Sequence, residues 1–191
     1  MSHQKKAVVM IYTHAFPKGK KCKVWLDELP DTALGPLFLD ARLPVQNAHR
    51  INNRKIAMEL VTQRHISSYG MLGLEWTALP TSNNADVNVH YNNAGGRIFT
   101  ETSAHNRNTV LAVMPEEYAE AVLQAAAAFV QSCPCFPSGR LAFTVGTHCL
   151  VGSSKALFRA LTHILLICLV SNRDMRDARA LETLLDSLLV F

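Results

Sequence analysis

Alternation of apolar and polar residues is clearest near the middle of the chain. From Asp86 to Tyr91 every second side chain is apolar, as in a strand with one buried face, and the polar positions include Asn88 and His90. The turn-forming residues Asn92–Gly96 follow, and a second extended stretch covers Arg97–Thr102. The pattern predicts a β-hairpin made of these two stretches.

Two further strands are predicted close to the N-terminus. Ala7–Tyr12 and Cys22–Leu26 are short apolar runs, and the basic, glycine-containing loop Phe16–Lys21 joins them, which is typical of a hairpin. Prolines and a glycine interrupt Leu29–Pro44. This segment is therefore expected to be irregular, with at most a brief strand at Leu37–Leu39.

Four stretches show helical signals. Asn47–Arg64 lacks glycine and proline and repeats its apolar residues at helical spacing. Pro115–Ser132 begins with a proline and two glutamates, which suit a helix N-terminus. A serine-capped helix is expected from Lys155, and a final amphipathic helix is expected after Asn172, whose side chain is a suitable cap.

The remaining segments predict strands and loops. Tyr69–Leu79, Thr109–Val113 and Leu141–Val145 are expected to be extended. Gly146–Gly152 is expected to form a loop that leads into the helix at Lys155. Because amphipathic helices need an apolar surface to cover, these elements predict an α+β fold, with an antiparallel or mixed sheet covered by helices in a two-layer sandwich.

Composition favours a single domain. The 191 residues are 49% hydrophobic and 18% charged, which is ordinary for one globular unit, and any division into lobes would fall in the loop Pro80–Asn84. The longest apolar run, Ile164–Val170, is too short to span a bilayer, and the first residues do not form a secretory signal. The five cysteines are an odd set and indicate reduced thiols. We therefore expect a soluble, cytoplasmic protein.

A net charge of +4 and a pI near 8.9 are compatible with an anionic partner. The candidate nucleic-acid interface consists of basic residues from the first third of the chain: Lys18, Lys20, Lys21, Lys23, Arg50, Arg54, Lys55 and Arg64. Clustered cations neutralise phosphates, and the nearby aromatics Tyr12, Phe16 and Trp25 could stack on unpaired bases. The alternative interpretation is a solvated lysine-rich turn and an ordinary charged helix face.

A second candidate site is the expected strand–loop–helix junction at 146–155. A helix N-terminus offers free backbone N–H groups to an anion, and His148, Ser153, Ser154 and Lys155 would surround it. The spacing of the glycines and lysine does not match a P-loop. A capped turn without a ligand explains the same residues.

Metal and histidine chemistry have weaker support. Cys133 and Cys135 are separated by one residue, and His148 adjoins Cys149, so neither pair has the usual spacing of zinc ligands, and no metal site is predicted. Histidines suited to acid–base work stand alone in the sequence, without a partner at a recognisable spacing. They are His14, His49, His65, His90 and His105.

Part of the chain resembles the later half of domain IV of translation elongation factor G. The matching order is Val113–Tyr118, a helix, a strand, Ser153–Ser154 and a further helix, over about a third of the chain. Gly95–Arg97 departs from the glycine-rich strand of that domain, so the resemblance assigns no family. It implies a small sheet with helices on one side, and RNA as the partner.

These observations favour a non-catalytic nucleic-acid-binding protein that binds RNA as a subunit of a larger assembly, without a cofactor. The alternative is a small enzyme that holds a phosphorylated or other anionic substrate at 146–155, with His90, His105 or His148 as a catalytic group. A third hypothesis is a structural role, in which the C-terminal helices expose an apolar face and mediate oligomer formation.

Overall fold

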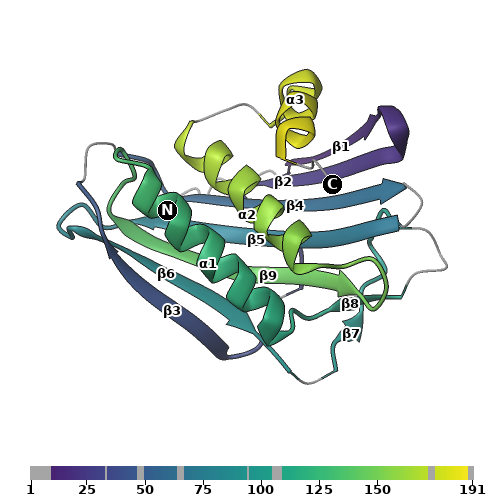
Figure 1. The fold of residues 1–191 in the computed structure, drawn as a ribbon, viewed down its shortest axis with the longest axis horizontal. Helices are drawn as coiled ribbons and strands as arrows, with labels where there is room; N and C mark the ends of the chain where they lie inside the picture. The colour runs from purple at the N-terminus through teal and green to yellow at the C-terminus, as the bar shows by residue number, and fades with distance from the viewer. Residues whose placement is uncertain are drawn as a thin grey trace, which may run out of the picture.

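The computed structural model describes residues 10–32, 34–46, 50–63, 67–93, 95–104, 109–171 and 175–188. Within them the chain forms one mixed sheet with helices on one face (Figure 1). The strands are β1 (Met10–Phe16), β2 (Lys20–Leu26), β3 (Leu37–Pro44), β4 (Arg54–Gln63), β5 (Ser67–Ala78), β6 (Asn84–Tyr91), β7 (Arg97–Ile98), β8 (Val110–Ala112) and β9 (Gly139–Cys149). The helices are α1 (Glu116–Ser132), α2 (Lys155–Val170) and α3 (Ala178–Leu188), and a short 3-10 turn, Pro17–Gly19, joins β1 to β2.

The strand order of the main sheet is β1-β2-β4-β5-β9-β6-β3. Neighbouring strands are antiparallel except β6 and β9, which are parallel and are connected through α1. The short strands β7 and β8 extend from one end of β9. Among the described residues, β1 and β3 therefore form the two long edges of the sheet.

The helices cover one face of this sheet. Figure 1 shows α1 over β6 and β3, α2 over β4 and β5, and α3 beside β1 and β2. The core between the layers contains the fully buried side chains of Leu72, Trp76, Phe143 and Phe158. Each such side chain stabilises the fold by roughly 1.5–3 kcal/mol through removal of apolar surface from water. The predicted α+β class and the helix-covered sheet are confirmed.

Local sequence signals position the helix ends. The Ser154 hydroxyl accepts a hydrogen bond from the Leu157 N–H at 3.2 Å, which caps α2 as predicted. The Asp177 carboxylate accepts bonds from the N–H groups of Arg179 and Ala180 and caps α3. The predicted cap of this last helix, Asn172, lies outside the described residues. None of the described helices is both long and apolar enough to cross a membrane.

A smaller core lies on the opposite face of the sheet. Trp25, Tyr69, Met71 and Val145 are buried there, and Phe99 packs onto them from the segment that follows β7. This segment covers only the part of the face formed by β2, β4, β5 and the end of β9. The remaining part, formed by β3, β6 and the start of β9, has no such cover from the residues that the structure describes.

The helix predicted over Asn47–Arg64 is wrong, because Arg54–Gln63 forms β4 in the middle of the sheet. Ile56, Met58 and Leu60 face the helices, while Ala57 and Val61 face the smaller core. A strand that is buried on both faces loses its simple alternation, so its apolar residues also fit a helical period.

The predicted hairpin of 86–91 with 97–102 is also wrong. The first stretch is β6, but it pairs with β3 and β9, whereas Arg97–Ile98 pairs with β8. β3 is also longer than the brief strand that was expected, since it runs over Leu37–Pro44. Alternation identified the strand, and the adjacent turn residues did not reveal its distant partners.

Several other predicted elements are confirmed. The N-terminal hairpin is present as β1 and β2, α1 ends at Ser132, and β5 and β8 lie close to their expected positions. The loop expected over Gly146–Gly152 is wrong in its first half, because β9 continues to Cys149. The loop Pro80–Asn84 is a turn between β5 and β6, two strands of the same sheet.

Candidate functional site

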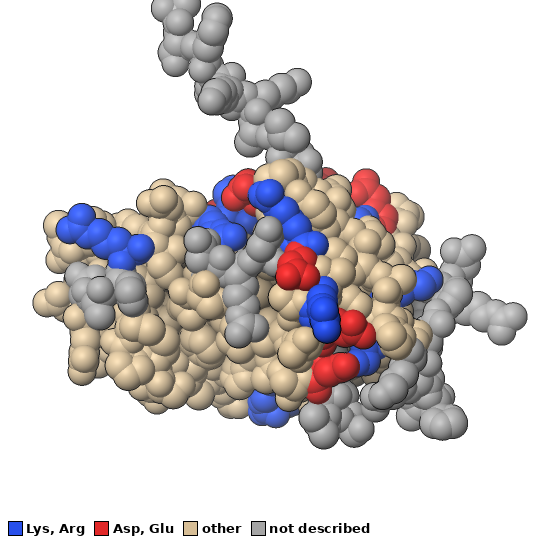
Figure 2. Space-filling model, turned by 90° about the horizontal axis from the view of Figure 1, so that it is seen from above, with Lys and Arg blue, Asp and Glu red and all other residues tan. Residues whose placement is uncertain are grey.

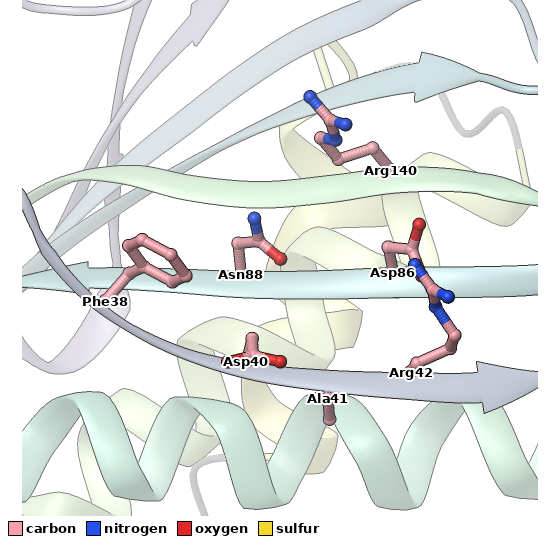
Figure 3. A pocket seen from close by; sticks show the side chains of 7 residues that line it. All are labelled: Phe38, Asp40, Ala41, Arg42, Asp86, Asn88 and Arg140. Carbon is pink, nitrogen blue, oxygen red and sulfur yellow. The ribbon is translucent and has the colours of Figure 1, made fainter.

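The uncovered part of the sheet carries a shallow hollow of about 470 Å³. Figure 3 shows its polar side chains on the face turned away from α1, while Ala41 points toward that helix. The residues come from three adjacent strands: Phe38, Asp40, Ala41 and Arg42 from β3, Asp86 and Asn88 from β6, and Arg140 from β9. We call this surface the open half of the sheet face.

Charged side chains of the open half form a row across three strands. Asp86 stands opposite Arg140 of β9 on one side and opposite Arg42 of β3 on the other. The Arg42 Nε donates to Asp86 Oδ1 at 2.7 Å. Within the described part of the chain no ion pair involves Arg140, which leaves an exposed guanidinium beside the hollow.

An aromatic ring and an amide complete the hollow. Phe38 is 52% exposed, and its ring centroid lies 5.7 Å from that of His90 at a tilt of 36°. The His90 Nδ1 is 3.3 Å from the carbonyl oxygen of Gly35, which orients the imidazole. Asn88 faces the hollow between Phe38 and Asp86 (Figure 3). The open half thus presents an exposed aromatic ring, a side-chain amide and a guanidinium without an ion-pair partner among the described residues.

We call the other part of this face, formed by β2, β4, β5 and the end of β9, the covered half. Its polar side chains form a buried hydrogen-bond network around Glu59. Glu59 is fully buried, and its Oε1 accepts hydrogen bonds from the hydroxyl groups of Tyr69 at 3.1 Å and Thr102 at 2.6 Å. The backbone N–H of Ser103 donates to both carboxylate oxygens. Since the Tyr69 proton goes to Glu59, Thr147 donates to the Tyr69 oxygen at 2.6 Å. Every one of these groups has a partner from the chain itself.

Burial in the covered half suppresses ionisation. Desolvation, followed by the nearby Glu59 carboxylate, raises the pKa of the Tyr69 phenol. The same two causes raise the pKa of Cys149 to about 11. These groups are therefore neutral near pH 7 and shielded from substrates, so we assign the network to holding the segment 99–104 against the sheet.

The predicted lysine cluster is divided between the two faces of the sheet. Lys20 is buried on the helix side, where it forms an ion pair with Asp186 of α3. Lys23 lies on the other face, with its Nζ 4.8 Å from the centroid of the Trp25 ring. Lys21 shares that face with Lys23, because side chains alternate along β2. The side chain of Lys18 is outside the described structure.

The remaining predicted basic residues lie near the start of β4. Arg54 donates to the carbonyl oxygen of Cys168 at 3.4 Å, at the end of α2, and Lys55 forms a 3.5 Å ion pair with Glu75. Arg50 is exposed beside two hollows of about 560 and 470 Å³. Arg64 lies outside the described residues. Basic and acidic side chains are also interspersed on the face shown in Figure 2.

The predicted anion-binding residues bond to neighbouring parts of the chain and not to one another. His148 is buried on β9, and its Nδ1 donates to the carbonyl oxygen of Val113 at 2.8 Å. The Ser153 hydroxyl donates to the Tyr69 carbonyl and accepts from the Cys149 N–H. Ser154 caps α2, and Lys155 pairs with Glu117 at 3.7 Å.. The structure brings these side chains near one turn, with each already bonded within the chain.

The cysteines and histidines do not gather into a metal-binding cluster among the described residues. The Cys133 and Cys135 sulfurs are 3.4 Å apart, and burial raises the pKa of Cys133. His49, His65 and His105 lie outside the described structure, and His14 stacks on Phe16 at 5.8 Å. His90 is the histidine that the structure places beside the hollow.

The sequence predicts parts of all three strands of the open half, at 37–39, 86–91 and 141–145, but not that they lie side by side. The polar positions of 86–91 were assigned to one face of a strand, but Phe38, Arg42 and Arg140 were not recognised as candidates. The signal that could have found Arg42 is the alternation of exposed residues along β3, which the flanking prolines obscured. Comparisons with protein-family models, curated proteins and solved structures found no match for the chain.

Proposed function

We propose that this protein is a non-catalytic binding protein for single-stranded nucleic acid, with RNA as the favoured ligand, and that it acts within a larger assembly. The observation that supports this function is the half-exposed ring of Phe38 beside Asn88 and the guanidinium of Arg140 on the open half of the sheet face. Sheet surfaces with exposed aromatic side chains provide stacking platforms for unpaired bases.

Each part of the hollow matches one part of a nucleotide. The Phe38 ring offers an apolar face to a base, and the Asn88 amide can both donate to and accept from a base edge. The Arg140 guanidinium is suited to a phosphate, because its planar donors match phosphate oxygens. A volume of about 470 Å³ lies within the usual range of small-ligand sites, about 300–1,000 Å³. One nucleotide is therefore a suitable occupant.

The charge of the hollow predicts how binding responds to salt. Arg42 is already paired with Asp86, and Asp40 adds a negative charge, so Arg140 is the cation left for a phosphate. For single strands the slope of log K against log salt concentration is about −0.7 for each phosphate neutralised. We expect a slope near that value, whereas binding through the divided basic cluster would give a steeper one.

The test is fluorescence anisotropy with labelled single-stranded RNA, single-stranded DNA and duplex RNA. Phe38→Ala should weaken binding of single-stranded RNA about fivefold or more, because base stacking on an aromatic ring contributes about 1–3 kcal/mol. Ile11→Ala is the matched control, since Ile11 is 49% exposed on the opposite edge strand, β1. Absence of binding at low salt, or equal effects of the two substitutions, would contradict the proposal.

A further inference from the structure

The edge strand β3 leaves a row of backbone groups without a neighbouring strand among the described residues. The Val45 N–H donates to the Asn83 carbonyl at 3.0 Å and continues the register in which β3 pairs with β6. Backbone groups alternate in direction along an antiparallel strand, so those of Leu39, Ala41 and Leu43 also face β6. The N–H and C=O groups of the residues between them consequently point outward.

Outward-facing groups belong to Phe38, Asp40 and Arg42. Pro44 is also at an outward-facing position, so its missing N–H removes no hydrogen bond to β6. Leu37 and Phe38 are 48% and 52% exposed at this edge. The edge therefore has free donors and acceptors together with apolar surface, which is the combination that another strand can cover.

We propose that β3 pairs antiparallel with β3 of a second copy of this chain, forming a symmetric dimer with one continuous sheet. A twofold axis perpendicular to the sheet keeps both helix layers on the same side. If it passes beside Ala41, Asp40 of each copy stands opposite Arg42 of the other, and Leu39 stands opposite Leu43. Each Asp40–Arg42 pair then exchanges both backbone hydrogen bonds and matches opposite charges.

The charge pattern selects this register over its neighbours. An axis beside Asp40 would place the two Asp40 side chains opposite each other, and an axis beside Arg42 would do the same for the arginines. Like charges directly opposite in a sheet are destabilising. In the proposed register, the row Arg140–Asp86–Arg42 continues into Asp40 of the second copy, so charges alternate along its whole length.

Charge-reversal variants test the register directly. In Asp40→Arg both residues of the pair are positive, and in Arg42→Asp both are negative, so neither variant should pair with itself. A mixture of the two variants restores opposite charges in both pairs. Size-exclusion chromatography with light scattering should show a dimer for the unchanged chain, a monomer for each variant, and a heterodimer in the mixture. No nucleic acid is present, so the result is independent of the proposed ligand.

Asp40→Pro provides a second test, because it removes an outward N–H without removing a hydrogen bond to β6. It should be monomeric, with a circular dichroism spectrum equal to that of the unchanged chain. Three results would overturn the proposal: a monomer for the unchanged chain over roughly a hundredfold range of concentration, dimers for the charge variants alone, or a dimer for Asp40→Pro. A mixture that stays monomeric would exclude the proposed register.

Discussion

The two halves of the sheet face opposite the helices use polar side chains in different ways. In the covered half, the Glu59 carboxylate is fully buried and accepts bonds from Tyr69, Thr102 and Ser103. In the open half, Phe38 is half exposed and Arg140 forms no ion pair with the described residues. The polar groups of the covered half are all bonded within the chain, whereas those of the open half are available to a ligand.

This difference predicts that substitutions in the two halves affect different properties, folding stability in one and ligand binding in the other. A buried polar group is costly when a partner is removed, because the remaining group loses both its bond and its contact with water. An exposed group regains water and costs little. Substitutions in the covered half should therefore lower the free energy of unfolding, whereas substitutions in the open half should lower ligand affinity and leave folding almost unchanged.

The largest expected effect is that of Glu59→Ala. It leaves the buried Tyr69 hydroxyl and the half-buried donors of Thr102 and Ser103 without their acceptor. Each unsatisfied group costs about 1–3 kcal/mol, so the free energy of unfolding should fall by about 3 kcal/mol or more. Urea denaturation measures this loss. Glu59→Gln keeps one acceptor oxygen and should lose about half as much. A loss below about 1 kcal/mol for Glu59→Ala would contradict the structural role of this network.

Gly139→Ala should affect both halves at once. An added Cβ would lie 2.5 Å from the Thr77 carbonyl oxygen and 2.5 Å from the Trp76 ring, and Arg140 of the hollow is the next residue. Such overpacking typically costs about 1–3 kcal/mol. Both thermal stability and RNA affinity should decrease. Gly95→Ala is the control, because its Cβ would meet nothing within 4 Å.

A smaller effect is expected from pH. Cys149 has an ordinary pKa of 9.0 when unfolded and about 11 when folded, because burial and Glu59 oppose its ionisation. The unfolded chain therefore loses the proton first, so the contribution of Cys149 to stability is constant below about pH 9 and falls as pH rises toward 11. Urea midpoints measured from pH 8 to 11 should fall less steeply for Cys149→Ala. Identical pH dependence in the two proteins would contradict this account.

The smallest expected effect on stability belongs to the open half. Arg42→Ala removes an ion pair in which the arginine side chain is 73% exposed, so the free energy of unfolding should change by less than about 1 kcal/mol. Urea denaturation under the conditions used for Glu59→Ala gives the direct comparison. A loss as large as that of Glu59→Ala would remove the distinction between the two halves.

Elements with local signals could be predicted from the sequence. The capping residue Ser154 predicted the start of α2, and Glu116 and Glu117 predicted the start of α1. β4 was mistaken for a helix because it is buried on both faces. The pairing of β6 with β3 and β9 depends on contacts between residues distant in the sequence, which no local pattern encodes.

The candidate site was less accessible to sequence reasoning for the same reason. Asn88 was placed on the polar face of a strand, but the hollow requires Phe38 and Arg140 from strands that are far away in the chain. The basic residues were predicted to form one surface because they are close together in the sequence. Alternation along β2 sends Lys20 to the helix side and Lys23 to the opposite face, so neighbours in sequence do not share a surface.

Ultraviolet crosslinking of the complex with single-stranded RNA, followed by mass spectrometry of the crosslinked peptides, tests the central claim most directly. If the open half binds the ligand, the crosslinked peptide should contain Phe38, and Phe38→Ala should abolish that crosslink. Crosslinks at Tyr12, Phe16 or Trp25 with none at Phe38 would contradict the account and assign binding to the N-terminal hairpin.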